Sequence, residues 1–146
     1  ILAARPRFEA MAREQYGLEI NVGPFGIDSR PALIGAKFAE DAGVGEAYHT
    51  AVFQAYWQEA KSLEDREVLL EIAEAVGLGR DAFAAALEKG TEWETAVTAD
   101  IDQAFNYGLS GVPALVFANK YLVSGAQPYE VLVQVTEQVA EELNGE

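Results

Sequence analysis

The stretch most able to bind another molecule is Gly111-Val112-Pro113. Pro113 stands at the entrance of a predicted strand, where a proline removes one donor from the strand ladder. Unpaired backbone groups beside such a residue can hold an extended peptide by strand-like pairing. An ordinary strand-entry proline in a trans peptide bond is the simpler interpretation of the same residue.

A second candidate follows directly, at Gly125-Ala126-Gln127 before the helix that Pro128 opens. The positive end of a helix favours an anion, for example a carboxylate of glutathione. Gly125, Ala126 and Gln127 are therefore candidate contacts for an anion or for glutathione. The alternative interpretation is a plain turn and helix cap.

The other reactive residue types lack the partners that catalysis needs. Carboxylates cluster at 64–67 and at 100–102, where a helix start and a helix face predict solvated charge. Ser110 has no His or Lys nearby in the sequence to activate it. His49 has Phe53 at the i+4 position instead of a second metal ligand. We expect no catalytic residue, metal or cofactor in these 146 residues.

The element that positions the first two candidates is a predicted hairpin followed by a helix. Residues 114–117 and 121–124 are short runs of strand formers, separated by a turn in which Asn119 can adopt a left-handed conformation. After the break at 125–127, the apolar residues recur at helical spacing. This C-terminal helix carries one stripe: Val131, Leu132, Val135, Val139 and Leu143.

Upstream, the pattern predicts a helix over 7–16, a half-buried strand at Leu18–Val22, and successive helices from 31 to 107. The helix over 46–60 is the most aromatic, and positions 49, 52, 53, 56 and 57 are expected to face a core. Three segments result: a linker helix and strand at 1–30, a helical domain at 31–107, and a strand-strand-helix segment at 108–146.

Three stretches give a resemblance to a known family. Gly111-Val112-Pro113, two strands, and Ser124-Gly125-Ala126-Gln127-Pro128 before an amphipathic helix resemble the end of a DsbA-like thioredoxin domain of the FrnE type. Ala55–Leu69 resembles a run in the inserted helical domain of that family, and Ala73–Leu78 continues it. The resemblance covers about residues 17–143.

This resemblance implies an α/β fold: a thioredoxin-like domain with an inserted helical bundle, mostly helical in the residues given. In the family the Val-Pro bond is cis, and the backbone before the proline pairs with a substrate peptide opposite a Cys-x-x-C motif. The substrate-binding residues carried over are Val112 and Pro113, with Gly111 beside them. The sequence departs from the family in having no cysteine, and the N-terminal strand-helix-strand part is missing.

The family strand equivalent to 114–117 pairs with the opening strand, so its edge here would be bare. We expect Leu18–Val22, a second copy in a homodimer, or a further N-terminal segment to cover it, because an exposed apolar edge invites aggregation.

The function that the resemblance implies is thiol–disulfide oxidoreductase, with a polypeptide thiol or disulfide as substrate and this chain supplying the binding loop. Two alternatives remain open. One is a glutathione-dependent relative of the kappa-class transferases and 2-hydroxychromene-2-carboxylate isomerases. The other is a peptide-binding domain without catalysis.

Composition and net charge indicate which classes of binding partner to expect. Hydrophobic residues make up 50% and charged residues 23%, which is typical of a globular protein. The net charge of -14 repels phosphate backbones and anionic lipid, so we expect neither nucleic acid nor a membrane as partner. With no signal peptide visible, we expect a cytoplasmic protein.

Overall fold

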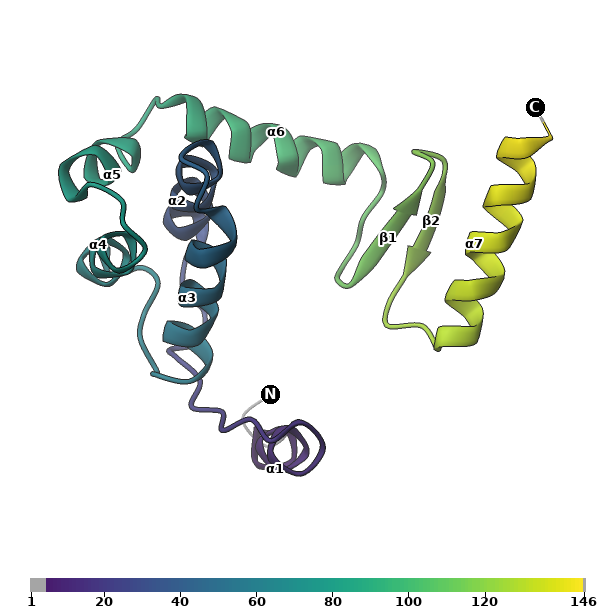
Figure 1. The fold of residues 1–146 in the computed structure, drawn as a ribbon, viewed down its shortest axis with the longest axis horizontal. Helices are drawn as coiled ribbons and strands as arrows, with labels where there is room; N and C mark the ends of the chain where they lie inside the picture. Colours follow the sequence, from purple (N-terminus) through teal and green to yellow (C-terminus); the bar gives the residue numbers. More distant parts are fainter. Residues whose placement is uncertain (1–4, 146) are drawn as a thin grey trace. The chain divides into compact units, whose positions relative to one another are not determined.

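The computed structural model describes residues 5–145. Contacts divide the chain into two compact units, residues 1–97 and 98–146, here named the helical unit and the hairpin unit. Helix α6 begins in the first and ends in the second. The elements of the described residues, drawn in Figure 1, are α1 (Arg5–Tyr16), α2 (Arg30–Asp41), α3 (Gly45–Trp57), α4 (Arg66–Ala75), α5 (Arg80–Ala86), α6 (Glu92–Asn106), β1 (Ala114–Phe117), β2 (Tyr121–Ser124) and α7 (Tyr129–Asn144).

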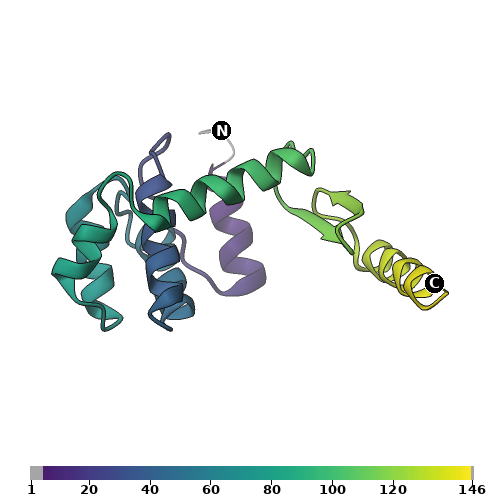
Figure 2. The ribbon, with the colours of Figure 1, turned by 90° about the horizontal axis from the view of Figure 1, so that it is seen from above.

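The core of the helical unit lies among α2, α3, α4 and α5, which gather side by side in Figures 1 and 2. Its largest fully buried side chains are Tyr48, Leu69 and Phe83. The Phe83 ring contacts Phe38 edge-on at 5.8 Å and Tyr48 at 5.6 Å between centroids. Aromatic contacts from three helices therefore join this core.

Side-chain hydrogen bonds mark the first turns of two helices in the helical unit. Asp65 caps α4 by accepting from the Glu67 amide at 2.9 Å. Thr91 and Glu94 form a capping arrangement at α6, although the Glu94 carboxylate accepts from the Gly90 amide rather than from Thr91 itself.

The strand predicted at Leu18–Val22 is wrong. These residues form no strand, and Asn21 and Gly23 donate their backbone amides to the carbonyls of Trp57 and Tyr56. Those carbonyls belong to the last turn of α3, where no amide of the helix itself is available to donate to them. The segment thus closes the end of α3 instead of joining a sheet.

The predicted core face of α3 is also partly wrong. Tyr48, Val52 and Ala55 are buried, whereas His49 is exposed and Phe53 is 52% exposed. The buried set follows i, i+4 and i+7, so the true stripe is rotated by one residue from the predicted one.

In the hairpin unit, the predicted strands are confirmed residue for residue. β1 and β2 pair antiparallel, with Leu115 opposite Val123 and Val116 opposite Leu122. The turn has Ala118 and Asn119 at positive φ, as the left-handed prediction for Asn119 requires. Helix α7 follows, and Val139 is its buried residue.

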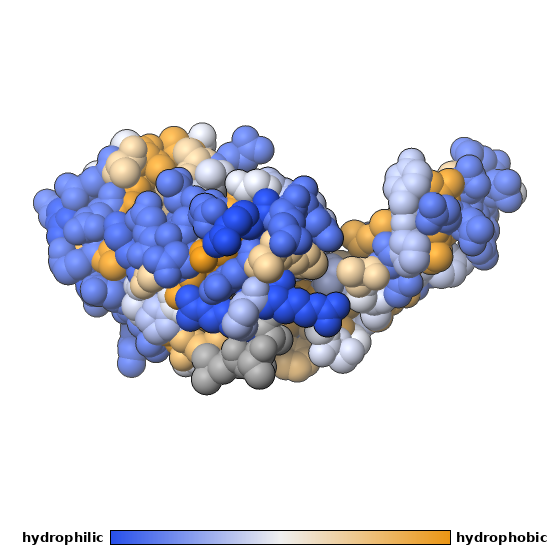
Figure 3. All heavy atoms as spheres, turned by 90° about the horizontal axis from the view of Figure 1, so that it is seen from below, coloured by the Kyte–Doolittle hydropathy of each residue, from blue (hydrophilic) through white to orange (hydrophobic). Residues whose placement is uncertain are grey.

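Hydrophilic residues dominate the face that Figure 3 shows, and hydrophobic atoms reach the surface between them in both units. Within residues 5–145, no helix combines the length and the apolar character that crossing a membrane requires.

Candidate peptide-binding site

The candidate loop enters β1 at an exposed position. Val112 is 93% exposed, and a Cβ added at Gly111 would meet no atom within 4 Å. The Val112–Pro113 peptide bond is cis. Within the described residues, neither the amide nor the carbonyl of Val112 has a hydrogen-bond partner. The loop therefore offers a free backbone donor and acceptor to solvent.

Two backbone hydrogen bonds hold the loop in place. Leu109 donates its amide to Ala104 O at 3.0 Å, which fastens the start of the loop to the end of α6. Gly125 donates its amide to Pro113 O at 2.8 Å, which extends the strand pairing beyond Ala114 and Ser124. Val112 lies between these anchors, so its position is fixed although its own groups are free.

The second predicted site lies against the first. Because the Gly125 amide donates a hydrogen bond to Pro113 O, the loop at 111–113 and the loop at 125–127 lie together at the same end of the hairpin. Gln127 donates its side-chain amide to Ser124 O at 2.8 Å, a role that closes the turn. Glu130, in the first turn of α7, offsets the positive helix end that an anion would use.

The opposite end of the hairpin is fastened by side chains. Tyr107 donates its hydroxyl to Asn119 Oδ1 at 2.9 Å, and Tyr121 donates its hydroxyl to Glu142. Lys120 lies 3.8 Å from the Glu142 carboxylate and 4.9 Å from the Tyr121 ring centroid. The hydrogen bond from Tyr121 is the main cause that lowers the pKa of Glu142.

The acidic cluster at 64–67 has structural roles. Glu64 accepts from the Asp28 amide at 3.0 Å, and Glu67 forms an ion pair with Arg80. His49 packs on Phe53 at 4.4 Å between ring centroids. Across residues 5–145, no group of three possible metal ligands comes together.

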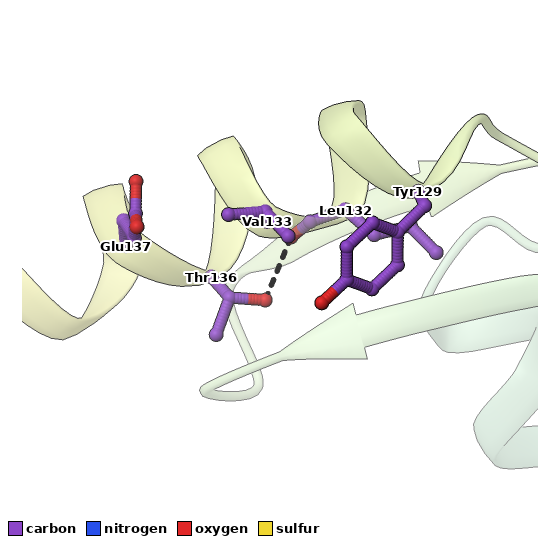
Figure 4. A pocket seen from close by; sticks show the side chains of 5 residues that line it. All are labelled: Tyr129, Leu132, Val133, Thr136 and Glu137. Atoms are coloured by element: carbon purple, nitrogen blue, oxygen red, sulfur yellow. Dashed lines mark hydrogen bonds between the residues drawn. The ribbon is translucent and has the colours of Figure 1, made fainter.

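Helix α7 carries a shallow hollow, drawn in Figure 4, that was not predicted from the sequence. Tyr129, Leu132, Val133, Thr136 and Glu137 line it. Thr136 turns its hydroxyl back to Leu132 O at 2.7 Å, so the side chain offers its methyl group to the hollow. The helical spacing of these residues was visible in the sequence, but of the five only Leu132 belongs to the predicted stripe.

A family model supplies the decisive comparison. The model of the DSBA-like thioredoxin domain matches residues 7–137. The chain belongs to this family. The predicted family and the thioredoxin-like fold class are therefore confirmed.

Solved structures agree with the family. The structure of a probable DsbA oxidoreductase, SCO1869 from Streptomyces coelicolor, aligns with 96% of this chain at a TM-score of 0.77 and 29% identity. A candidate protein disulfide isomerase from Nitrosomonas europaea aligns with 97% of the chain at a TM-score of 0.68 and 17% identity, a likeness of fold.

These relatives are longer than the chain. The alignment spans 60% of SCO1869 and 74% of the Nitrosomonas europaea protein. The uncharacterized protein YwbO of Bacillus subtilis (strain 168) is 40% identical over 81 residues, which are 53% of this chain and 40% of YwbO.

Proposed function

We propose that this chain supplies the substrate-binding loop and the helical part of a FrnE-type thiol–disulfide oxidoreductase. The observation that carries the proposal is the loop at Val112, which is 93% exposed and has a free backbone amide and carbonyl. Membership of the DSBA-like family and the likeness to SCO1869 support the reaction class.

The loop would act by holding the backbone of an unfolded polypeptide. An extended peptide that pairs with Val112 gains main-chain hydrogen bonds without regard to its side chains. Such recognition suits an enzyme whose substrates share a disulfide rather than a sequence.

The chemistry itself needs sulfur atoms that these 146 residues do not include. In exchange, an enzyme thiolate attacks one sulfur of a substrate disulfide and forms a mixed disulfide, while the other substrate sulfur leaves as a thiolate. A second enzyme thiolate then releases the substrate and leaves an enzyme disulfide. In this proposal the redox cysteines come from polypeptide outside the given sequence, and Val112 keeps the substrate in place.

Two substitutions at one position test the loop. Val112→Pro removes the backbone donor, whereas Val112→Ala shortens the side chain and keeps the donor. The ligand is an S-alkylated, cysteine-containing peptide. V112P should weaken its binding about tenfold, because the loss of one hydrogen bond of about 1.4 kcal/mol changes the dissociation constant by that factor. V112A should bind within about twofold of the original chain, because an exposed side chain contributes little.

Circular dichroism of both variants is the control for folding, and we expect spectra equal to that of the original chain because the loop is exposed. Equal binding by the original chain and V112P would overturn the proposed role of the Val112 backbone. Failure of the original chain to bind any extended peptide would overturn the proposed function.

A further inference from the structure

The part of the chain around the candidate loop is almost without charge. Residues 103–136 carry two charged side chains, Lys120 and Glu130. The loop at 111–113, whose free backbone groups would receive a peptide, lies within this stretch. The charge that stands nearer to the loop therefore decides which charge in a substrate segment is favoured.

The positive charge stands at the far end of the hairpin. Lys120 belongs to the turn after β1, whereas the loop enters β1 at its other end, a strand of four residues or about 13 Å away. Its ammonium group lies 3.8 Å from the Glu142 carboxylate and 4.9 Å from the Tyr121 ring centroid. Lys120 is thus paired at its own end and supplies no cation to the loop.

The negative charge stands at the same end as the loop. Figure 1 shows α7 starting at the end of the hairpin where β1 starts. The Gly125 amide donates to Pro113 O at 2.8 Å, and Glu130 follows Gly125 by five residues, which span at most about 18 Å. Glu130 is exposed, and among the described residues its carboxylate has no hydrogen bond or ion pair.

A bound peptide would reach this carboxylate. An extended chain advances about 3.3 Å per residue, so residues up to about five positions from the one that pairs with Val112 come within range of Glu130. A basic side chain at such a position gains an exposed ion pair, whereas an acidic one is repelled.

We propose that Glu130 makes the Val112 loop selective for basic polypeptide segments, with Lys or Arg within about five residues of the residue that pairs with Val112. This selectivity presupposes the proposed function, because it defines the substrate class of the same loop. The net charge of -14 attracts cationic segments to the chain as a whole. Glu130 adds a preference that is local to the loop.

The test uses three S-alkylated, cysteine-containing peptides that differ only at the positions three residues before and three residues after the cysteine, where they carry Lys, Gln or Glu. Fluorescence anisotropy measures their affinities for the original chain. At physiological ionic strength the Lys peptide should bind about threefold more tightly than the Gln peptide, and the Glu peptide should bind most weakly. The differences should fade at about 0.5 M salt, because salt screens exposed charges.

Two variants distinguish Glu130 from the charge of the whole chain. Glu130→Gln should reduce the preference for the Lys peptide over the Gln peptide from about threefold to less than about 1.5-fold. Glu141→Gln removes the same charge at an exposed position eleven residues further along α7, about 16 Å away along the helix axis. That distance exceeds the screening length of about 8 Å, so E141Q should keep the preference.

Equal affinities of the Lys and Gln peptides for the original chain would overturn the selectivity. An equal loss of preference in E130Q and E141Q would overturn the role of Glu130. The comparison of peptides uses the original chain, so it stands even where a variant fails to fold. Failure of all three peptides to bind would instead overturn the proposed function. Equal binding of all three, with weaker binding by V112P, would leave that function in place and overturn the selectivity alone.

Discussion

At the scale of single residues, Tyr48 buries a polar group unfavourably in the helical unit. The side chain is 1% exposed, and its hydroxyl has no hydrogen-bond partner among the described residues. Burial disfavours the ionised form and raises the pKa of Tyr48 above its ordinary value of 10.0. The hydroxyl also lies against Gly35, where an added Cβ would be 2.4 Å from it.

We expect Tyr48→Phe to raise the free energy of unfolding by about 1 kcal/mol, because it removes an unsatisfied buried hydroxyl. Urea denaturation at pH 7 measures the change. A loss of stability larger than about 1 kcal/mol would mean that the hydroxyl has a favourable role that the contacts do not show.

We also expect the free energy of unfolding to depend differently on pH in the original chain and in Y48F. Above pH 10.0, Tyr48 loses its proton in the unfolded chain but keeps it in the folded chain. The folded state then binds more protons, so its stability falls as pH rises through this range, by up to about 1.4 kcal/mol for each pH unit. The original chain should therefore lose more stability between pH 10 and 11 than Y48F, and equal losses would contradict the assignment.

At the scale of the elements, the cap of α4 is a contact of predictable size. Asp65→Ala removes the side-chain bond to the Glu67 amide and should lower the free energy of unfolding by about 1 kcal/mol. Ser29 is a matched control, because it occupies the N-cap position of α2 without a side-chain hydrogen bond. If S29A costs as much as D65A in urea denaturation, the capping bond is not the cause.

The hydrogen bond from Tyr121 in the hairpin to Glu142 in α7 can be detected through the pKa of Glu142. Tyr121→Phe removes the hydroxyl that lowers the pKa of Glu142, so that pKa should rise toward its ordinary value of 4.5 in an NMR titration. The interaction favours the folded form above pH 4.5 and fades as pH falls through the lowered pKa. Tyr129→Phe removes a hydroxyl that has no partner among the described residues and should leave the pKa of Glu142 unchanged.

Elements fixed by local signals could be predicted from the sequence, and elements fixed by distant partners could not. The hairpin at 114–124 is specified by its own turn and strand formers. Leu18–Val22 alternates like a strand, but its amides bond to the end of α3, which alternation cannot reveal. Val52 and Phe53 both fit the apolar stripe predicted for this helix, so the sequence did not show that only Val52 is buried.

The candidate site divides in the same way. The loop at Val112 could be located because a Gly-Val-Pro sequence before strand formers is a local pattern. The α7 hollow could not, because an apolar residue on an amphipathic helix gives no sign of whether a neighbour covers it.

At the scale of the whole molecule, the two units differ in how much core they possess. Sixteen of the seventeen buried apolar residues belong to the helical unit, and Val139 is the one in the hairpin unit, among those described. Both tryptophans, Trp57 and Trp93, also belong to the helical unit. Tryptophan fluorescence therefore reports on one unit, while circular dichroism reports on both.

We expect the hairpin unit to unfold at a lower urea concentration than the helical unit, because it buries less apolar surface. Far-ultraviolet circular dichroism should begin to change before the fluorescence does. Coincident transitions would show that the units unfold together, contrary to this expectation.

The most direct test of the central claim is a titration of the ¹⁵N-labelled chain with an S-alkylated, cysteine-containing peptide, followed by NMR. We expect the largest shifts at the amides of Gly111, Val112 and Ala114, which surround the free backbone groups of the loop. Saturable binding that shifts only residues of the helical unit, or no binding at all, would contradict this expectation.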